Sequence, residues 1–124
     1  MADDTRPLIL IVEDNADTRE VLGRILAMQG YHVVTARDGL DAFGYLGSGI
    51  MPHAIILDIA MPIMDGITFS QRMRADERWA HIPVIVYTAL RERSISTAHA
   101  VFRKGTDDPS RLLALVAQLC DAKH

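Results

Sequence analysis

Hydrophobic positions along the chain fall into short runs separated by amphipathic stretches. Aliphatic runs occupy 8–12, 32–36, 54–57 and 84–87, and a fifth covers 98–102. Such short runs are typical of strands buried on both faces of a sheet. Apolar residues spaced by three and four predict helices at about 16–29, 39–46, 67–74 and from Pro109 onward. Strands that alternate with helices favour an α/β fold with a parallel sheet.

Two of the expected helices raise specific questions. The first is expected to begin at a cap formed by Asn15 or Asp17. Its expected inward side consists of Val21, Leu22, Ile25 and Met28. The last helix carries a broad apolar stripe that consists of Leu112, Leu113, Leu115, Val116 and Leu119. A stripe facing the core is the favoured interpretation, and an exposed surface for a homodimer or another partner stays open.

Composition and charge narrow the class of protein. With 124 residues, 49% of them hydrophobic, we expect one domain over 1–124 with a core from about 7 to 119. The net charge of −3 gives no general attraction to nucleic acid or an anionic membrane. The single cysteine excludes an internal disulfide, the acidic start is no secretory signal, and no apolar run approaches the ~20 residues of a membrane span. We therefore expect a cytoplasmic domain, and the native-looking ends favour a complete chain.

Polar side chains follow four of the five expected strands. Glu13 and Asp14 follow the first, Asp58 the third, Thr88 the fourth and Lys104 the fifth. The carboxyl ends of parallel strands share one edge of a sheet, so these groups should converge. Carboxylates at ~4 Å repel by about 4 kcal/mol per pair at an effective dielectric near 20, and a bound Mg²⁺ would relieve that repulsion. One of the carboxylates, best Asp58, could then act as a nucleophile towards a phosphoryl donor.

Three segments together carry a family resemblance. They are Ile11-Val12-Glu13-Asp14-Asn15, the stretch from Leu57-Asp58 to Asp65-Gly66, and the stretch from Ile82-Pro83 to Thr88-Ala89. From about Pro7 to Leu119 the chain resembles the receiver domain of two-component response regulators. The resemblance implies a (βα)5 flavodoxin-like, doubly wound parallel sheet with strand order 2-1-3-4-5. It also implies phosphoryl transfer from a histidine kinase or a phosphotransfer protein, and a downstream partner that the sequence does not identify.

The resemblance also implies roles for individual residues. Asp58 would be the phosphoacceptor, with Thr88 and Lys104 contacting the phosphoryl group. The Mg²⁺ ligands would be Asp14, Asp58, the Ala60 carbonyl and, through a water, Glu13. Such a domain is not an enzyme for other substrates; it catalyses only its own phosphorylation and dephosphorylation. Because Ala60 and Leu90 cannot orient a water, we expect the dephosphorylation to be slow.

The chain departs from the family pattern in three places. Thr88 and Lys104 are 16 positions apart, fewer than usual, which predicts a shortened or atypical fourth helix. Gly105 replaces the family's proline after the lysine, so the usual cis peptide is not expected. Val101 occupies the position of the aromatic switch residue, and strand alternation should turn Phe102 to the opposite face.

Three other functions stay open at this stage. A degenerate receiver would act as a phosphorylation-independent protein-binding module, which the altered lysine region favours and the acidic residues oppose. A flavodoxin-like electron carrier would need a phosphate loop after the first strand, where Glu13 and Asp14 would repel the phosphate. A phosphatase with an aspartate nucleophile usually has a second Asp two residues on, where this chain has Ala60.

Overall fold

Five parallel strands form one sheet in the order β2-β1-β3-β4-β5, as expected. The computed structural model describes residues 6–61, 64–89, 98–105 and 108–121. The strands are β1 (Leu8–Val12), β2 (His32–Ala36), β3 (Ala54–Leu57), β4 (Val84–Thr88) and β5 (Ala100–Arg103). The helices in this part of the chain are α1 (Ala16–Met28), α2 (Gly39–Gly47), α3 (Gly66–Arg74) and α4 (Pro109–Asp121).

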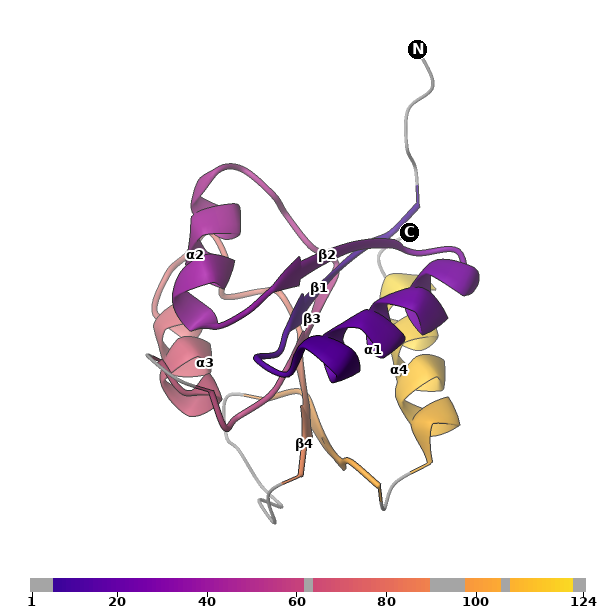
Figure 1. Cartoon of the computed structure of the whole chain (residues 1–124). Coiled ribbons are helices and arrows are strands. Elements are labelled where there is room, and N and C mark those ends of the chain that lie inside the picture. The colour runs from indigo at the N-terminus through magenta and orange to yellow at the C-terminus, as the bar shows by residue number, and fades with distance from the viewer. Residues whose placement is uncertain (1–5, 62–63, 90–97, 106–107, 122–124) are drawn as a thin grey trace.

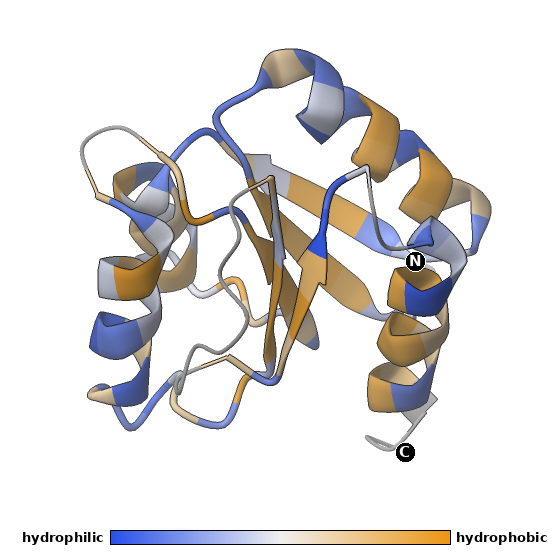
Figure 2. Ribbon diagram, turned by 90° about the horizontal axis from the view of Figure 1, so that it is seen from below, coloured by the Kyte–Doolittle hydropathy of each residue, from blue (hydrophilic) through white to orange (hydrophobic). Residues whose placement is uncertain are grey.

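The sheet lies between two helical layers, with α2 and α3 on one face and α1 and α4 on the other (Figure 1). Side-chain alternation along the strands divides the core accordingly. Leu10 and Val12 of β1 join the cluster beneath α2 and α3, whereas Ile9 and Ile11 join the cluster beneath α1 and α4. The central strands are hydrophobic along their length and the helices carry polar residues on their outer sides (Figure 2). This double burial explains why the strands are continuous aliphatic runs.

The two helices that raised questions in the sequence have different outcomes. In α4, Leu112, Val116 and Cys120 are buried in the cluster shared with α1, which confirms the core-facing stripe. In α1 the expected inward side is wrong, because the buried residues are Leu22 and Leu26. The other residues expected to face inward, Val21, Ile25 and Met28, are 56%, 36% and 84% exposed. Leu22 has apolar neighbours on two sides of the helix, Ile25 on one side and Leu26 on the other. The side with Leu26 is the one that packs against the sheet.

The connection between β4 and β5 holds the greatest departure from the family pattern. The altered helix expected there falls on residues 90–97, which lie outside the described residues. After these residues β5 pairs with β4, and the pairing extends to the Lys104 amide, which donates to the Thr88 carbonyl at 2.8 Å. The described residues contain no cis peptide bond, in agreement with the expectation for Gly105, which has φ +77°. No helix in the described ranges is long and apolar enough to cross a membrane.

The turn between β3 and α3 depends on a glycine. The Gly66 amide donates to the Ile59 carbonyl at 2.9 Å, and the Asp65 side chain caps α3 by accepting from the Thr68 amide at 2.8 Å. A Cβ atom at Gly66 would lie 2.3 Å from the Asp58 carbonyl oxygen and 2.8 Å from the Ile59 Cα. Both neighbours are backbone atoms that cannot rotate away, so any side chain at this position must push the Asp58 backbone out of place.

Replacement of Gly66 therefore tests this turn. We expect Gly66→Ala to lower the free energy of unfolding by about 2–3 kcal/mol, because the added methyl overpacks the turn. Gly44→Ala in α2 is the matched control, since a Cβ there meets nothing within 4 Å. It should raise stability by about 0.5–1 kcal/mol through helix propensity. Urea unfolding of both variants measures the difference, and equal effects would contradict the steric account.

Candidate functional site

Three polar residues stand one position beyond a strand, and each stays hydrogen-bonded to the neighbouring strand. The Glu13 amide donates to the Ala36 carbonyl at 3.0 Å, and the Asp58 amide donates to the Val12 carbonyl at 3.0 Å. Lys104 is held in the same way by its bond to Thr88. The backbone ladders thus run one residue past the strands and fix the starting points of these side chains.

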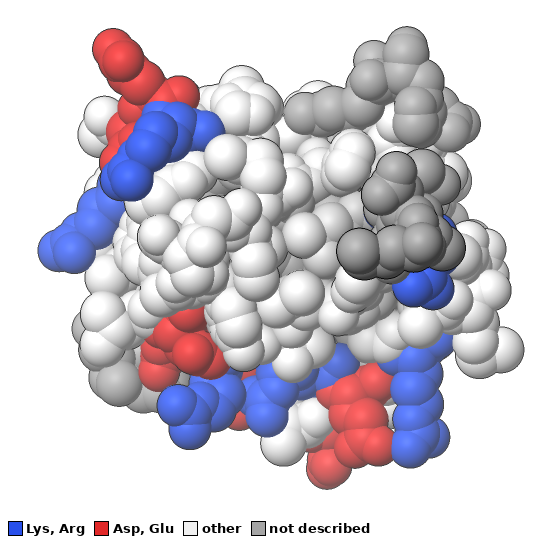
Figure 3. Space-filling view, turned by 90° about the horizontal axis from the view of Figure 1, so that it is seen from above, with Lys and Arg blue, Asp and Glu red and all other residues white. Residues whose placement is uncertain are grey.

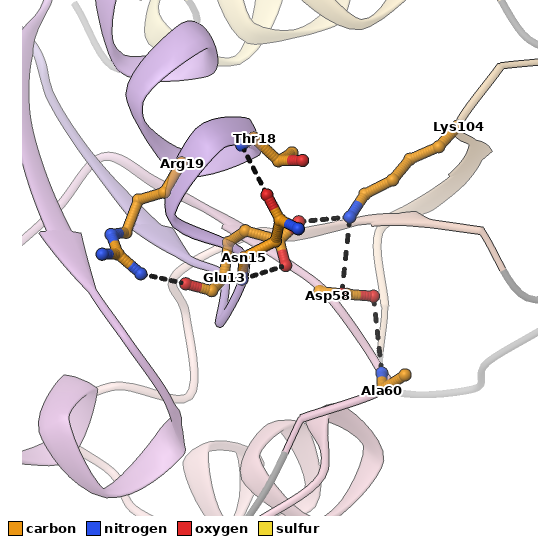
Figure 4. Close-up of polar contacts among 7 residues, drawn as sticks. All are labelled: Glu13, Asn15, Thr18, Arg19, Asp58, Ala60 and Lys104. Carbon is orange, nitrogen blue, oxygen red and sulfur yellow. Dashed lines mark hydrogen bonds and ion pairs between the residues drawn. The ribbon is translucent and has the colours of Figure 1, made fainter.

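The Lys104 ammonium lies between the two buried carboxylates (Figure 4). It forms a hydrogen-bonded ion pair with Glu13 Oε1, and its Nζ is 3.4 Å from Asp58 Oδ2. Glu13 is 3% exposed and Asp58 is 7% exposed, so solvent screens neither charge well. Lys104, which follows Thr88 at an unusually short spacing, is therefore in contact with both acids.

Glu13 is held by the beginning of α1 as well as by the sheet. Its Oε2 accepts from the Asn15 amide at 3.3 Å, and its carbonyl accepts from Arg19 Nη1 at 2.9 Å. The Asn15 side chain accepts from the Thr18 amide at 2.9 Å, so Asn15, and not Asp17, caps α1. The loop after β1 is consequently anchored at both ends, and the Glu13 carboxylate has little freedom to leave the site.

A third carboxylate completes the acidic cluster. Oxygen atoms of Glu13, Asp14 and Asp58 all lie within 4.8 Å of one another, and Asp14 is exposed. Among the described residues this is the only group of three or more His, Cys, Asp or Glu side chains so placed. The donors are oxygens without an imidazole or a thiolate, the set that Mg²⁺ prefers, and the exposed member leaves a side open to water. The cluster fits Mg²⁺.

The other residues that the sequence singled out are Thr88, Ala60, Val101 and Phe102. Thr88 ends β4 and is fully buried, and the Ala60 amide is 3.4 Å from Asp58 Oδ1. Phe102 packs against the core beneath α1 and α4, as strand alternation predicts, while Val101 is half-buried opposite Val86. The metal-ligand role of the Ala60 carbonyl and the water held by Glu13 remain predictions.

Two contacts of the site had no clear signal in the sequence. Arg19 has the pattern of an ordinary surface residue of α1, yet its guanidinium fixes the Glu13 carbonyl. Tyr87 precedes Thr88 in β4, and its side chain points to the opposite face of the sheet. The sequence predicted only that Tyr87 belongs to a strand. Its ring centroid lies 5.8 Å from Lys104 Nζ, at the outer limit of a cation–π contact. Tyr87 pairs with Phe102, and Lys104 lies two residues further on the same face, so the register of β4 and β5 brings the ring and the ammonium close together.

The close packing of charges shifts two proton equilibria. Burial, together with the neighbouring Asp58 carboxylate, raises the pKa of Glu13 from 4.5 to about 7, although the contact with Lys104 opposes the shift. For Lys104, burial lowers the pKa, but the contacts with Glu13 and Asp58 outweigh burial and hold the pKa above its ordinary value. Lys104 thus stays cationic at neutral pH, and Glu13 changes its charge most easily.

The raised pKa of Glu13 predicts a pH dependence of stability. Between pH 4.5 and about 7 the folded state binds more protons than the unfolded state, so the free energy of unfolding should fall as the pH rises. In metal-free buffer we expect Glu13 to contribute a loss of about 1–3 kcal/mol across this range. Urea unfolding at several pH values measures it.

Two variants separate this contribution from that of other groups. Glu13→Gln should flatten the pH profile, whereas Asp17→Asn, which changes an exposed carboxylate of α1, should keep the profile of the original chain. A Glu13→Gln profile as steep as that of the original chain would contradict the assignment.

Comparisons with known proteins agree with this geometry. The family model of the response regulator receiver domain matches residues 9–109. The transcriptional regulator RpaA of Synechocystis is 39% identical over 102 residues, which are 82% of this chain and 41% of RpaA. The regulatory protein PrrA of Mycobacterium tuberculosis is 35% identical over 119 residues, which are 93% of this chain and 49% of PrrA. The chain thus spans less than half the length of these relatives.

Solved structures show the same fold. The receiver domain of a histidine kinase from Syntrophus aciditrophicus matches with a TM-score of 0.85 and 31% identity, covering 94% of this chain and 91% of that one. The response regulator TrrA of Thermotoga maritima, in complex with Mg²⁺–BeF, matches with a TM-score of 0.81 and 27% identity, covering 91% of this chain and 98% of that one. With its sheet order, its acidic cluster and a family match across most of its length, the chain belongs to the receiver domains of two-component response regulators.

Proposed function

We propose that Asp58 accepts a phosphoryl group from a histidine kinase or a phosphotransfer protein, and that the phosphorylated chain signals through a partner protein. The observation that carries the proposal is the position of the Asp58 carboxylate, which lies within the acidic cluster and 3.4 Å from the Lys104 ammonium. A carboxylate in contact with a cation and close to a metal site can attack a phosphoryl group that the acids alone would repel.

The transfer needs little from the protein beyond positioning and charge. One Asp58 oxygen attacks the phosphorus atom of a phosphohistidine, so that an O–P bond forms while the P–N bond breaks and the imidazole leaves. The Ala60 amide and the Lys104 ammonium each contact one oxygen of the Asp58 carboxylate and hold its orientation. Lys104, cationic at neutral pH, then balances the negative charge of the phosphoryl oxygens.

Magnesium would be held by Asp14, Asp58 and the Ala60 carbonyl, with Glu13 acting through a water. When bound, Mg²⁺ supplies positive charge that offsets the repulsion between these carboxylates and an incoming phosphoryl group. The chemistry of the donor set supports this assignment, as does the similarity to TrrA, which was crystallised with Mg²⁺–BeF.

The similarity to receiver domains supports a histidine kinase or a phosphotransfer protein as the class of phosphoryl donor, but it does not identify the individual donor. A histidine kinase or a phosphotransfer protein as donor would place the reaction in the cytoplasm. The expectation that nucleic acid is no partner finds no support, because RpaA is named a DNA-binding regulator and extends far beyond the region matched here. The family assignment also favours a receiver over an electron carrier or a phosphatase, which leaves the degenerate receiver as the alternative.

Labelling with a small phosphodonor separates a phosphoacceptor from a degenerate receiver. With acetyl phosphate and Mg²⁺ we expect the intact mass of the chain to increase by one phosphoryl group. Asp58→Asn should abolish the increase, Asp17→Asn should keep it, and removal of Mg²⁺ by EDTA should reduce it to background. An unlabelled wild-type chain, or labelling that survives Asp58→Asn, would exclude the phosphoacceptor role of Asp58.

The lifetime of the aspartyl phosphate is a separate prediction. Ala60 is exposed beside Asp58 and has no side-chain group that could orient an attacking water, so we expect slow hydrolysis. Ala60→Asn adds such a group and should shorten the lifetime by about tenfold, or ~1.4 kcal/mol in activation free energy. Intact-mass measurement after removal of the phosphodonor follows the decay. Loss of the phosphoryl group within seconds from the original chain would contradict this prediction.

A further inference from the structure

The strand β2 has an edge that no other described strand covers. It lies at the end of the sheet order and, among the described residues, pairs only with β1. The His32 amide donates to the Pro7 carbonyl, and the Ala36 carbonyl accepts from the Glu13 amide, so alternate residues from His32 to Ala36 bond to β1. The backbone N–H and C=O groups of the residues between them, Val33 and Thr35, therefore point away from the sheet.

The described residues of this edge lack the proline, the charges and the bulge that often protect an exposed strand. The residues Val33, Val34 and Thr35 include no proline and no charge, and all three are β-branched. The pairing of β2 with β1 runs over five consecutive residues without a bulge. An unprotected edge of this length is suited to pairing with another strand.

A groove of about 460 Å³ lies over the same edge, between β2 and α1. Val33 and Thr35 line it from the strand, and small residues line it from the helix; these are Ala16, Gly23 and Ala27. A Cβ atom at Gly23 would lie 3.8 Å from Val33 Cγ1 and 4.0 Å from Thr35 Cγ2, which is ordinary contact. The described chain thus has room for a side chain at Gly23, yet it carries a glycine that weakens the middle of a helix by about 1 kcal/mol. Close approach of a second backbone would explain it.

Charged side chains of both signs line the groove, and one of them, Arg19, is bonded to the Glu13 carbonyl. Glu20 and Arg24 lie on either side of Gly23, form an ion pair at 2.6 Å and have side chains that are 62% and 75% exposed. Basic and acidic side chains lie next to one another along the lower border of Figure 3, the side that faces the viewer in Figure 1. A two-fold axis near Val34 and Gly23 would bring Glu20 of one copy to Arg24 of the other, and Val33 of one copy to Thr35 of the other.

We propose that two copies of this chain associate through antiparallel pairing of their β2 strands. Val33 of each copy then exchanges both backbone hydrogen bonds with Thr35 of the other, and the two sheets continue as one sheet of ten strands. The α1 helices meet along their small residues, with Glu20 and Arg24 paired across the axis. The groove reaches the start of α1, where Arg19 contacts the Glu13 carbonyl, but none of the residues that pair across the axis belongs to the acidic cluster. The proposal goes beyond the phosphoacceptor function without depending on it.

Analytical ultracentrifugation over a range of concentrations tests the association. We expect a reversible monomer–dimer equilibrium for the original chain. Thr35→Pro removes the outward N–H of β2, and an edge strand tolerates proline at such a position, so the dimer should weaken about tenfold or more. Thr35→Val keeps the N–H and the β-branched shape and should dimerise like the original chain.

Two further sets of variants test the helix contact. Gly23→Gln should weaken the dimer while it raises the stability of the monomer, because the new side chain occupies the groove. Glu20→Arg should weaken the dimer by placing like charges across the axis, and the double variant Glu20→Arg with Arg24→Glu should restore it. Hydrogen exchange should show protection of the Val33 and Thr35 amides that increases with protein concentration.

Three results would overturn the proposal. They are a wild-type chain that stays monomeric at millimolar concentration, a dimer that Thr35→Pro leaves unchanged, and concentration-dependent protection confined to elements other than β2 and α1. Phosphoryl labelling of Asp58 is an independent measurement, because none of the substituted residues belongs to the acidic cluster. Failure of the labelling would refute the phosphoacceptor function and leave the dimer standing, and failure of the dimer would leave the labelling intact.

Discussion

The extension of the backbone ladders by one residue beyond the strands is the constraint on which the site depends. The backbone positions of Glu13, Asp58 and Lys104 are fixed, because the amide of each residue donates a hydrogen bond to a carbonyl of the adjacent strand. The strands are in turn fixed by burial on both faces, which sets their register. The same hydrophobic alternation that builds the core therefore places two acids and a lysine side by side.

The arrangement also explains how the acids tolerate each other. Two carboxylates with 3% and 7% exposure would repel strongly in the interior of a protein. The Lys104 ammonium contacts both carboxylates and compensates part of that repulsion. The pKa of Glu13 is nevertheless raised, chiefly by burial and to a smaller extent by the neighbouring Asp58 carboxylate. The site keeps a net negative charge, its third carboxylate is exposed, and all its ligand atoms are oxygens. These are the properties of a site that binds a divalent cation. Metal binding and the reactivity of Asp58 thus have one electrostatic origin.

Much of the fold and of the site could be predicted from the sequence, because the pattern of this chain is dominated by local rules. Aliphatic runs located the strands, and the polar residues that follow them located Glu13, Asp58 and Lys104. The inward side of α1 could not be predicted in this way, since apolar residues lie on both sides of Leu22 and only packing decides between them. The contact of Arg19 with the Glu13 carbonyl depends on the reach of a long side chain, which no spacing rule encodes. The contact of Tyr87 with Lys104 depends on the register between β4 and β5, which the sequence alone did not fix.

Titration of the metal-free chain with Mg²⁺ by isothermal calorimetry tests most directly whether the acidic cluster is a cation site. We expect one Mg²⁺ to bind per chain, with binding lost when Asp14→Asn and Asp58→Asn are combined and retained in Asp17→Asn. We also expect weaker binding as the pH falls below about 7, where Glu13 takes up a proton. The absence of binding at saturating Mg²⁺, or binding indifferent to Asp14 and Asp58, would contradict the account.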